Sequence, residues 1–181
     1  KIHQVDIAER EIISSINTPG SSPTGLTWDG SYLWLGDFNE HRIFKLDPLT
    51  GLVQDSIKIP SPGYNPSGLS WREGKLWVSD LSSSYIMEVD PESGEMENYY
   101  YSSGYYPSDS AWDEENFWVL DYSKHTISKT NPGEQAFRQV NIGVPSWFGL
   151  AYILTIAPVI MSILSIVKQP KRRLPSEEKK Q

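Results

Sequence analysis

Short runs of apolar residues recur along the chain in one register. The run Pro23-Thr-Gly-Leu-Thr-Trp28 returns 43 residues later at 66–71 and again 41 residues after that at 107–112. Six residues after each of these Trp comes a second Trp, and three residues later an Asp. A spacing kept over three copies identifies an internal repeat. The repeated positions are Trp34, Trp77 and Trp118; Asp37, Asp80 and Asp121; and Ile43, Ile86 and Ile127.

Each repeat predicts four short β-strands, which in the first copy cover 25–28, 32–35, 42–46 and 52–59. Residues 42–46 alternate between polar and apolar side chains, as in a half-buried strand. The pair Asp29-Gly30 is typical of a hairpin turn, because glycine tolerates positive φ. Four-stranded units of about 40 to 45 residues have the size of propeller blades. The sequence therefore predicts an all-β fold of four-stranded antiparallel β-propeller blades.

The register also predicts the division of the chain. Residues 2–6 match 43–47, so residues 1–22 are expected to form the outer half of a preceding blade. Three further blades should cover 23–65, 66–106 and 107–143, followed by a short linker at 144–147. Because propellers generally close with four to eight blades, we expect the sequence to be the C-terminal part of a longer propeller. The alternative is that two copies pair as a homodimer to complete a ring.

The repeated Trp and Asp have structural interpretations. Large rings fill the space between neighbouring blades, so the Trp are expected in the core, with a ligand-stacking platform as the alternative. An Asp at the end of a strand accepts backbone N–H bonds in the following turn. We expect this role for Asp37, Asp80 and Asp121, with metal binding as the alternative.

These motifs resemble the repeats of six- and seven-bladed propellers of the NHL, streptogramin-lyase-like and glutamine-cyclotransferase-like groups. The likeness rests on Gly25-Leu-Thr-Trp-Asp-Gly30, on Leu33-Trp-Leu-Gly-Asp37 and on residues 43–51. Residues 39–43 resemble the Asn-His-Arg-Ile step of NHL repeats, with one extra residue. The resemblance covers residues 2–143 and implies the architecture alone, since folds host many functions. No catalytic motif of the lyase or the cyclotransferase can be placed on this sequence.

A single transmembrane α-helix is predicted at 148–167, where twenty residues carry no charge. At about 1.5 Å per residue the segment would span about 30 Å, the thickness of a bilayer core. Lys168 and three further basic residues at 171–173 follow, which predicts a cytoplasmic C-terminus and an extracytoplasmic propeller. Residues 168–181 are expected to be a basic, disordered tail. A buried helix and a removable sorting signal are the alternatives for the apolar segment.

Charge and composition limit the classes of partner and of metal site that this chain can have. The chain of 181 residues has a formal net charge of −7, and its first 146 residues hold 10 basic and 21 acidic side chains. An acidic body repels phosphate backbones, so nucleic acid is not an expected partner. Cysteine is absent, which excludes disulfides and Cys-ligated metal sites. No cofactor, metal site or catalytic residue is predicted.

One set of loops is predicted to form a ligand face. Loops that join the second and third strands of a blade lie on the same side of a propeller as the loops between blades. Aromatic rings beside short polar groups suit sugars or peptides, and two His at one repeat position could also serve as bases or metal ligands. The candidate ligand-binding residues are His41, Tyr64, Asn65, Tyr105, Tyr106 and His125.

Three functions are therefore compared. The favoured hypothesis is a membrane-anchored extracytoplasmic module, located at the cell membrane, that binds a protein, peptide or glycan. The second is a propeller enzyme of lyase, cyclotransferase or lactonase type whose catalytic residues lie mostly in other blades. The third is a spacer within a larger membrane complex.

Overall fold

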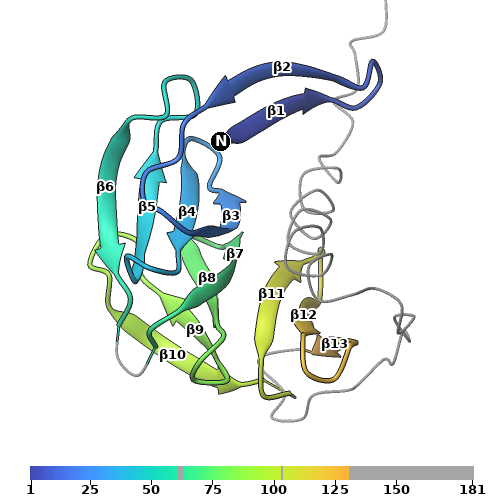
Figure 1. Ribbon diagram of the computed structural model, residues 1–181. Helices are drawn as coiled ribbons and strands as arrows, with labels where there is room; N and C mark the ends of the chain where they lie inside the picture. The colour runs from blue at the N-terminus through green and yellow to red at the C-terminus, as the bar shows by residue number, and fades with distance from the viewer. Residues whose placement is uncertain (61–62, 103, 131–181) are drawn as a thin grey trace, which may run out of the picture.

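The computed structural model describes residues 1–60, 63–102 and 104–130, and these residues contain β-strands and no helix. The four sheets follow one another around an arc (Figure 1). The strands are β1 (Ile2–Asp6), β2 (Glu11–Ile16), β3 (Pro23–Trp28), β4 (Leu33–Asp37), β5 (Arg42–Leu46), β6 (Val53–Lys58), β7 (Pro66–Arg72), β8 (Lys75–Asp80), β9 (Tyr85–Val89), β10 (Met96–Tyr101), β11 (Pro107–Trp112), β12 (Phe117–Asp121) and β13 (Thr126–Thr130).

All strand pairs are antiparallel and join neighbours in the sequence, as a blade requires. Strands β3 to β6 form one four-stranded sheet, called the first blade, and β7 to β10 form the middle blade. The third blade contains β11, β12 and β13, and the N-terminal hairpin contains β1 and β2. The all-β architecture of four-stranded antiparallel blades, predicted from the repeat, is confirmed.

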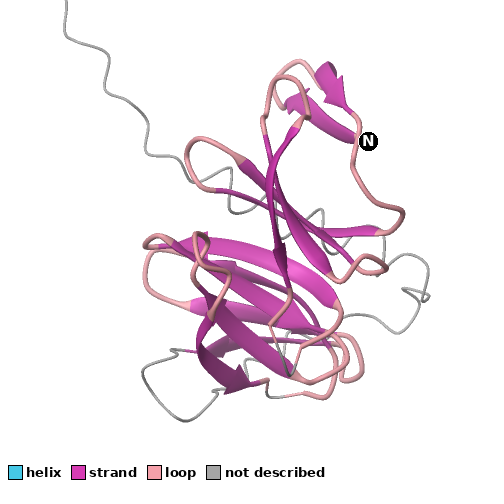
Figure 2. Ribbon diagram, turned by 90° about the vertical axis from the view of Figure 1, so that its left-hand side faces the viewer, coloured by secondary structure: helices cyan, strands magenta, loops and turns pink. Residues whose placement is uncertain are grey.

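The first strand of each blade lies toward the centre of the arc. These inner strands, β3, β7 and β11, are neighbours in space, while β6 and β10 lie on the outside (Figure 1). Figure 2, turned by 90°, shows that the described residues form strands joined by loops. The inner strands approach closely because Gly25 has no Cβ: a Cβ there would lie 2.6 Å from the backbone nitrogen of Leu69.

The second Trp of the first and middle blades fills the space between neighbouring sheets. Trp34 is 1% exposed and stacks on Trp71 with ring centroids 6.3 Å apart. Trp77 meets Trp112 edge-on at 5.0 Å. The core role predicted for these rings is confirmed at both interfaces, whereas Trp118 of the third blade is only half-buried.

The turn between the first and second strands is stabilised differently in the first and middle blades. In the first blade, the Asp29 carboxylate accepts the backbone N–H of Ser31 and of Tyr32 and the indole N–H of Trp34. In the middle blade, the two turn residues Glu73 and Gly74 both have positive φ, as a tight hairpin turn needs. Both turns reverse the chain so that the second strand pairs with the first.

The C-terminal predictions fall outside the described residues. The expected fourth strand of the third blade, the linker at 144–147, the helix at 148–167 and the tail at 168–181 all lie there. Within the described ranges, no helix is long and apolar enough to cross a membrane.

Candidate binding face

The acid at the end of each second strand ties two loops together. Asp80 is fully buried, and its Oδ1 accepts the N–H of Ser82 at 3.0 Å and of Ser83 at 2.7 Å, within its own blade. Its Oδ2 accepts the N–H of Tyr64 at 2.7 Å and of Asn65 at 2.6 Å, in the loop that enters the blade. One carboxylate therefore fixes the backbone of both loops.

The same arrangement recurs in the other two blades. Asp37 accepts the N–H of Ser22 at 2.8 Å and two N–H groups of its own turn. Asp121 accepts the N–H of Tyr106 at 3.1 Å and of Lys124 at 2.8 Å. These hydrogen bonds confirm the structural role predicted for the three acids.

A second contact joins consecutive blades, and it comes from a residue with left-handed backbone conformation. His41 and Ser84 occupy one repeat position and have φ of 53° and 64°. The His41 imidazole Nδ1 lies 2.7 Å from the Tyr64 carbonyl oxygen, and the Ser84 hydroxyl donates to the Tyr105 carbonyl at 2.6 Å. In each loop between blades, backbone N–H groups therefore bind a buried Asp of the following blade, and a backbone carbonyl contacts a side chain of the preceding blade.

Three predicted tyrosines project from these fixed loops. Tyr64 is 64% exposed, Tyr105 72% and Tyr106 49%. The Tyr64 ring meets the His41 ring edge-on, with centroids 6.4 Å apart. Asn65 is only half-buried: its amide nitrogen donates to the Ser82 hydroxyl, and its side-chain oxygen is buried with no partner among the described residues. Rigid backbone with exposed rings is an arrangement that can contact a ligand without ordering a loop.

The two candidate histidines are not brought into one site. His41 contacts Tyr64 of the next loop, whereas the His125 ring lies 6.3 Å from Tyr122 of its own blade. His125 shares the left-handed conformation of His41, with φ of 53°. No group of three His, Asp or Glu in the described ranges is placed to hold a metal ion. We call the residues His41, Tyr64, Asn65, Tyr105, Tyr106 and His125 the loop face.

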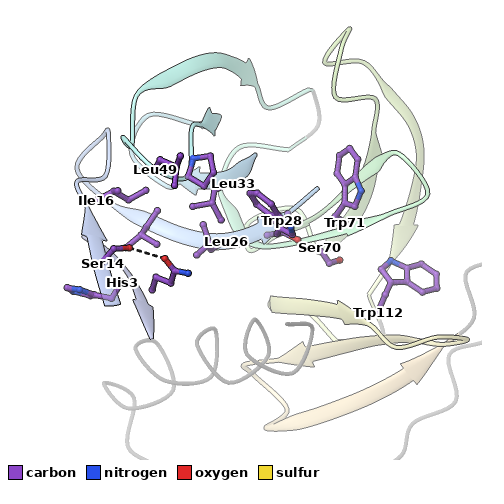
Figure 3. A pocket seen from close by; sticks show the side chains of 14 residues that line it. His3, Ser14, Ile16, Leu26, Trp28, Leu33, Leu49, Ser70, Trp71 and Trp112 are labelled. Carbon is purple, nitrogen blue, oxygen red and sulfur yellow. Dashed lines mark hydrogen bonds between the residues drawn. The ribbon is translucent and has the colours of Figure 1, made fainter. Parts of the chain in front are cut away.

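Sequence reasoning missed a cavity on another part of the molecule. It has a volume of about 510 Å³ and lies between the N-terminal hairpin and the first blade, reaching the first Trp of all three repeats (Figure 3). Those residues, Trp28, Trp71 and Trp112, are half-buried. The repeat predicted a core position for these rings as well, and they are less buried than Trp34 and Trp77.

A buried carboxylate on the innermost strand of the third blade was also missed. Asp109 is 1% exposed and takes the repeat position of Gly25 and Gly68. Its Oδ1 accepts the Ser110 N–H at 2.8 Å, and its Oδ2 has no partner among the described residues. Burial raises the pKa of this carboxyl well above its ordinary value. The departure from Gly in the repeat was the signal that could have identified it.

The chain was compared with known proteins. No protein-family model matches it, and no curated protein matches its sequence. Its structure is similar to virginiamycin B lyase from Staphylococcus aureus, with a TM-score of 0.57 and 17% identity over 78% of this chain and 48% of the lyase chain. It is also similar to glutaminyl cyclase from Myxococcus xanthus, with a TM-score of 0.53 and 14% identity over 62% of this chain and 49% of the cyclase.

A third similar structure is hydrazine synthase from Kuenenia stuttgartiensis, with a TM-score of 0.55 and 17% identity over 70% of this chain and 37% of that one. The chain spans about half the length of the lyase and the cyclase, or less for the synthase. Identities this low show the fold and carry no activity across. The chain therefore folds as β-propeller blades of the kind that the repeat resembles.

Proposed function

We propose that this chain is a binding module, a set of propeller blades that presents its loop face to a protein, peptide or glycan at the outer surface of a membrane. The observation that carries the proposal is the fixed backbone beneath exposed tyrosines. Asp80 accepts the backbone N–H groups of both Tyr64 and Asn65, and His41 Nδ1 lies 2.7 Å from the Tyr64 carbonyl oxygen, while Tyr64 stays 64% exposed. Tyrosine supplies large contact area at low entropic cost, which favours recognition.

The membrane part of the proposal rests on the sequence. The uncharged segment 148–167 followed by basic residues supports a single anchoring helix with the C-terminus in the cytoplasm. The blades would then lie on the extracytoplasmic side, close to the bilayer. Extraction of the full chain from membranes at alkaline pH tests this: a chain released without detergent is not anchored as proposed.

Binding is tested by presenting the full chain, in mild detergent, to arrays of glycans and of peptides. We expect a binder whose affinity falls about tenfold in Tyr64→Ala and in Tyr105→Ala, the loss typical of a contact at the centre of an interface. Tyr99→Ala is the matched control, because Tyr99 is as exposed as Tyr106 but lies on the outermost strand of the middle blade. An equal loss in the control, or no specific binder, would contradict the proposal.

The likeness to a lyase and a glutaminyl cyclase favours one alternative, a propeller enzyme. It is tested by incubating the full chain with virginiamycin B and with a peptide that begins with glutamine. Turnover of either substrate would replace the binding proposal with the enzymatic one.

A further inference from the structure

Three tyrosines of the middle blade pack against one another near its outer edge. Tyr85 lies on β9, and Tyr99 and Tyr101 lie on β10, the outermost strand of this blade (Figure 1). The Tyr85 ring meets the Tyr99 ring and the Tyr101 ring with centroids 5.0 Å apart in each case, and the rings of Tyr99 and Tyr101 are 6.0 Å apart. We call these three residues the tyrosine cluster.

The strand register brings two members of the cluster together at their hydroxyl ends. Tyr85 and Tyr101 are direct partners in the ladder between β9 and β10, although they are 16 residues apart in the chain. Directly opposed residues of an antiparallel pair have Cβ atoms about 4.5–5.5 Å apart, so the backbone itself holds this pair together. The Tyr85 hydroxyl donates to the Tyr101 hydroxyl at 3.5 Å.

The cluster is open to solvent on one side and fixed to the core on the other. Tyr101 is 63% exposed and Tyr99 is 49% exposed, whereas Tyr85 is half-buried and packs against the hydrophobic core. A reagent in solution can therefore reach Tyr101, while its neighbour Tyr85 is held in place by the blade.

The repeat does not require tyrosine at these positions. In the first blade, Arg42 and Lys58 stand opposite each other across β5 and β6, where the middle blade has Tyr85 and Tyr101. The Arg42 guanidinium there donates to the hydroxyl of Ser56, the residue that corresponds to the third tyrosine of the cluster. A blade can thus form with polar and charged side chains at these positions, so the three phenols call for another explanation.

We propose that the tyrosine cluster is a site of oxidative modification, at which a one-electron oxidant of phenols joins Tyr85 to Tyr101 as a dityrosine. This inference goes beyond binding at the loop face and does not depend on it. The chain contains no cysteine, so no disulfide can hold its strands. The new bond would fix β10, whose outer edge has no partner strand among the described residues.

The coupling removes two electrons and two protons in total. Each phenol gives one electron to the oxidant and its hydroxyl proton to water, which leaves two phenoxyl radicals. The ring carbons next to the hydroxyl-bearing carbons then form one carbon–carbon bond, and the hydrogen displaced from each of them restores a hydroxyl group. With a peroxidase and hydrogen peroxide, the electrons and protons reduce one peroxide to two waters. The cross-linked chain is lighter by two hydrogen atoms.

The test treats the full chain, diluted in mild detergent, with a haem peroxidase and limiting hydrogen peroxide. The product is followed by dityrosine fluorescence, by intact mass and by mass spectrometry of proteolytic peptides. The variants Tyr85→Phe and Tyr101→Phe each keep the ring and remove the hydroxyl that forms the radical. The controls are Tyr99→Phe within the cluster and Tyr105→Phe on the loop face, where Tyr105 is 72% exposed.

We expect a product with the mass of a single chain less two hydrogen atoms, in which the cross-linked peptides join Tyr85 to Tyr101. Its midpoint of thermal unfolding should be raised, because a cross-link restricts the unfolded chain. The yield should fall about tenfold or more in Tyr85→Phe and in Tyr101→Phe, since a reacting ring held in place by the fold is lost. Both control variants should keep the yield.

Three results would overturn the proposal. The first is a set of cross-links that join other tyrosines or separate chains in place of Tyr85 and Tyr101. The second is an unchanged yield in Tyr101→Phe. The third is a loss in Tyr99→Phe as large as in Tyr101→Phe, because the strand register would then not select the reacting pair.

Discussion

The middle blade and the first blade share their sequence pattern but not their surroundings. The middle blade has a neighbouring sheet on each side, and Leu69, Leu76, Val78 and Val89 are all at most 3% exposed. The first blade has a full neighbour on one side only, and its Leu26 and Leu33 remain half-buried. Burial in this fold therefore depends on the next blade as much as on the residue, as expected of repeat proteins in which neighbours supply the core.

The largest predicted difference concerns the two Trp on the two sides of the first blade. Trp34→Ala removes a ring that is 1% exposed and should cost about 3–5 kcal/mol of unfolding free energy. Trp28→Ala should cost clearly less, because its ring borders the cavity. Denaturant unfolding of both variants measures the difference. Equal losses would mean that Trp28 is covered in solution and that the two sides do not differ.

Removing the buried Asp that anchors a loop should cost more unfolding free energy in the middle blade than in the first blade. Asp80 accepts four backbone N–H groups, and Asp80→Ala should cost at least about 3 kcal/mol, since hydrogen bonds to a charged group are each worth about 1.5–3 kcal/mol. Asp37 accepts three such bonds, so Asp37→Ala should cost less. Exchange of the Tyr64 amide should accelerate in the Asp80 variant alone. A variant of exposed Asp55 serves as the control.

The close approach of inner strands should be equally tight on both covered sides. A Cβ on Gly68 would lie 2.4 Å from the Cα of Asp109, and a Cβ on Gly25 would lie 2.6 Å from a backbone nitrogen. Gly68→Ala and Gly25→Ala should each cost about 1–3 kcal/mol through forced backbone shifts. Gly36→Ala should cost less, because its nearest neighbour is a side-chain oxygen at 3.1 Å. A neutral Gly25→Ala would show that the first and middle blades are farther apart.

The smallest effect is a pH dependence from Asp109 in the third blade. Burial raises its folded-state pKa above the ordinary value of about 3.9, so the folded protein holds a proton that the unfolded chain has lost. Stability is then lost as pH rises above that ordinary value. Asp109→Asn should therefore raise the thermal midpoint more at pH 7 than at pH 4, with Asp55→Asn unchanged. A shift of the same size at both pH values would contradict this account.

Much of the fold could be predicted because three copies of one pattern share a register. The strand at 42–46 was predicted with the bounds that the structure has, and the acids at 37, 80 and 121 were assigned their hydrogen-bonding role. The loop face was predicted from blade topology, which places equivalent loops on one side. That His41 contacts Tyr64 while His125 contacts Tyr122 could not be predicted, because these contacts depend on side-chain conformation.

The cavity could not be predicted for a different reason. The repeat pattern predicts which residues face a neighbouring blade, but it does not predict which strands pack against them. Trp28 and Trp71 are the same residue in the same register, yet only Trp71 has a ring partner among the described residues. Asp109 departs from the pattern in another way, because its carboxylate lies against Gly68 of the middle blade at a repeat position where the first two copies have Gly.

Native-state hydrogen exchange of the full chain in mild detergent measures whether the covered middle blade is more stable than the half-covered first blade. We expect the slowest exchange in β7, β8 and β9, and the fastest strand exchange in β1, whose one described partner is β2. Protection of β1 equal to that of β9 would contradict this expectation.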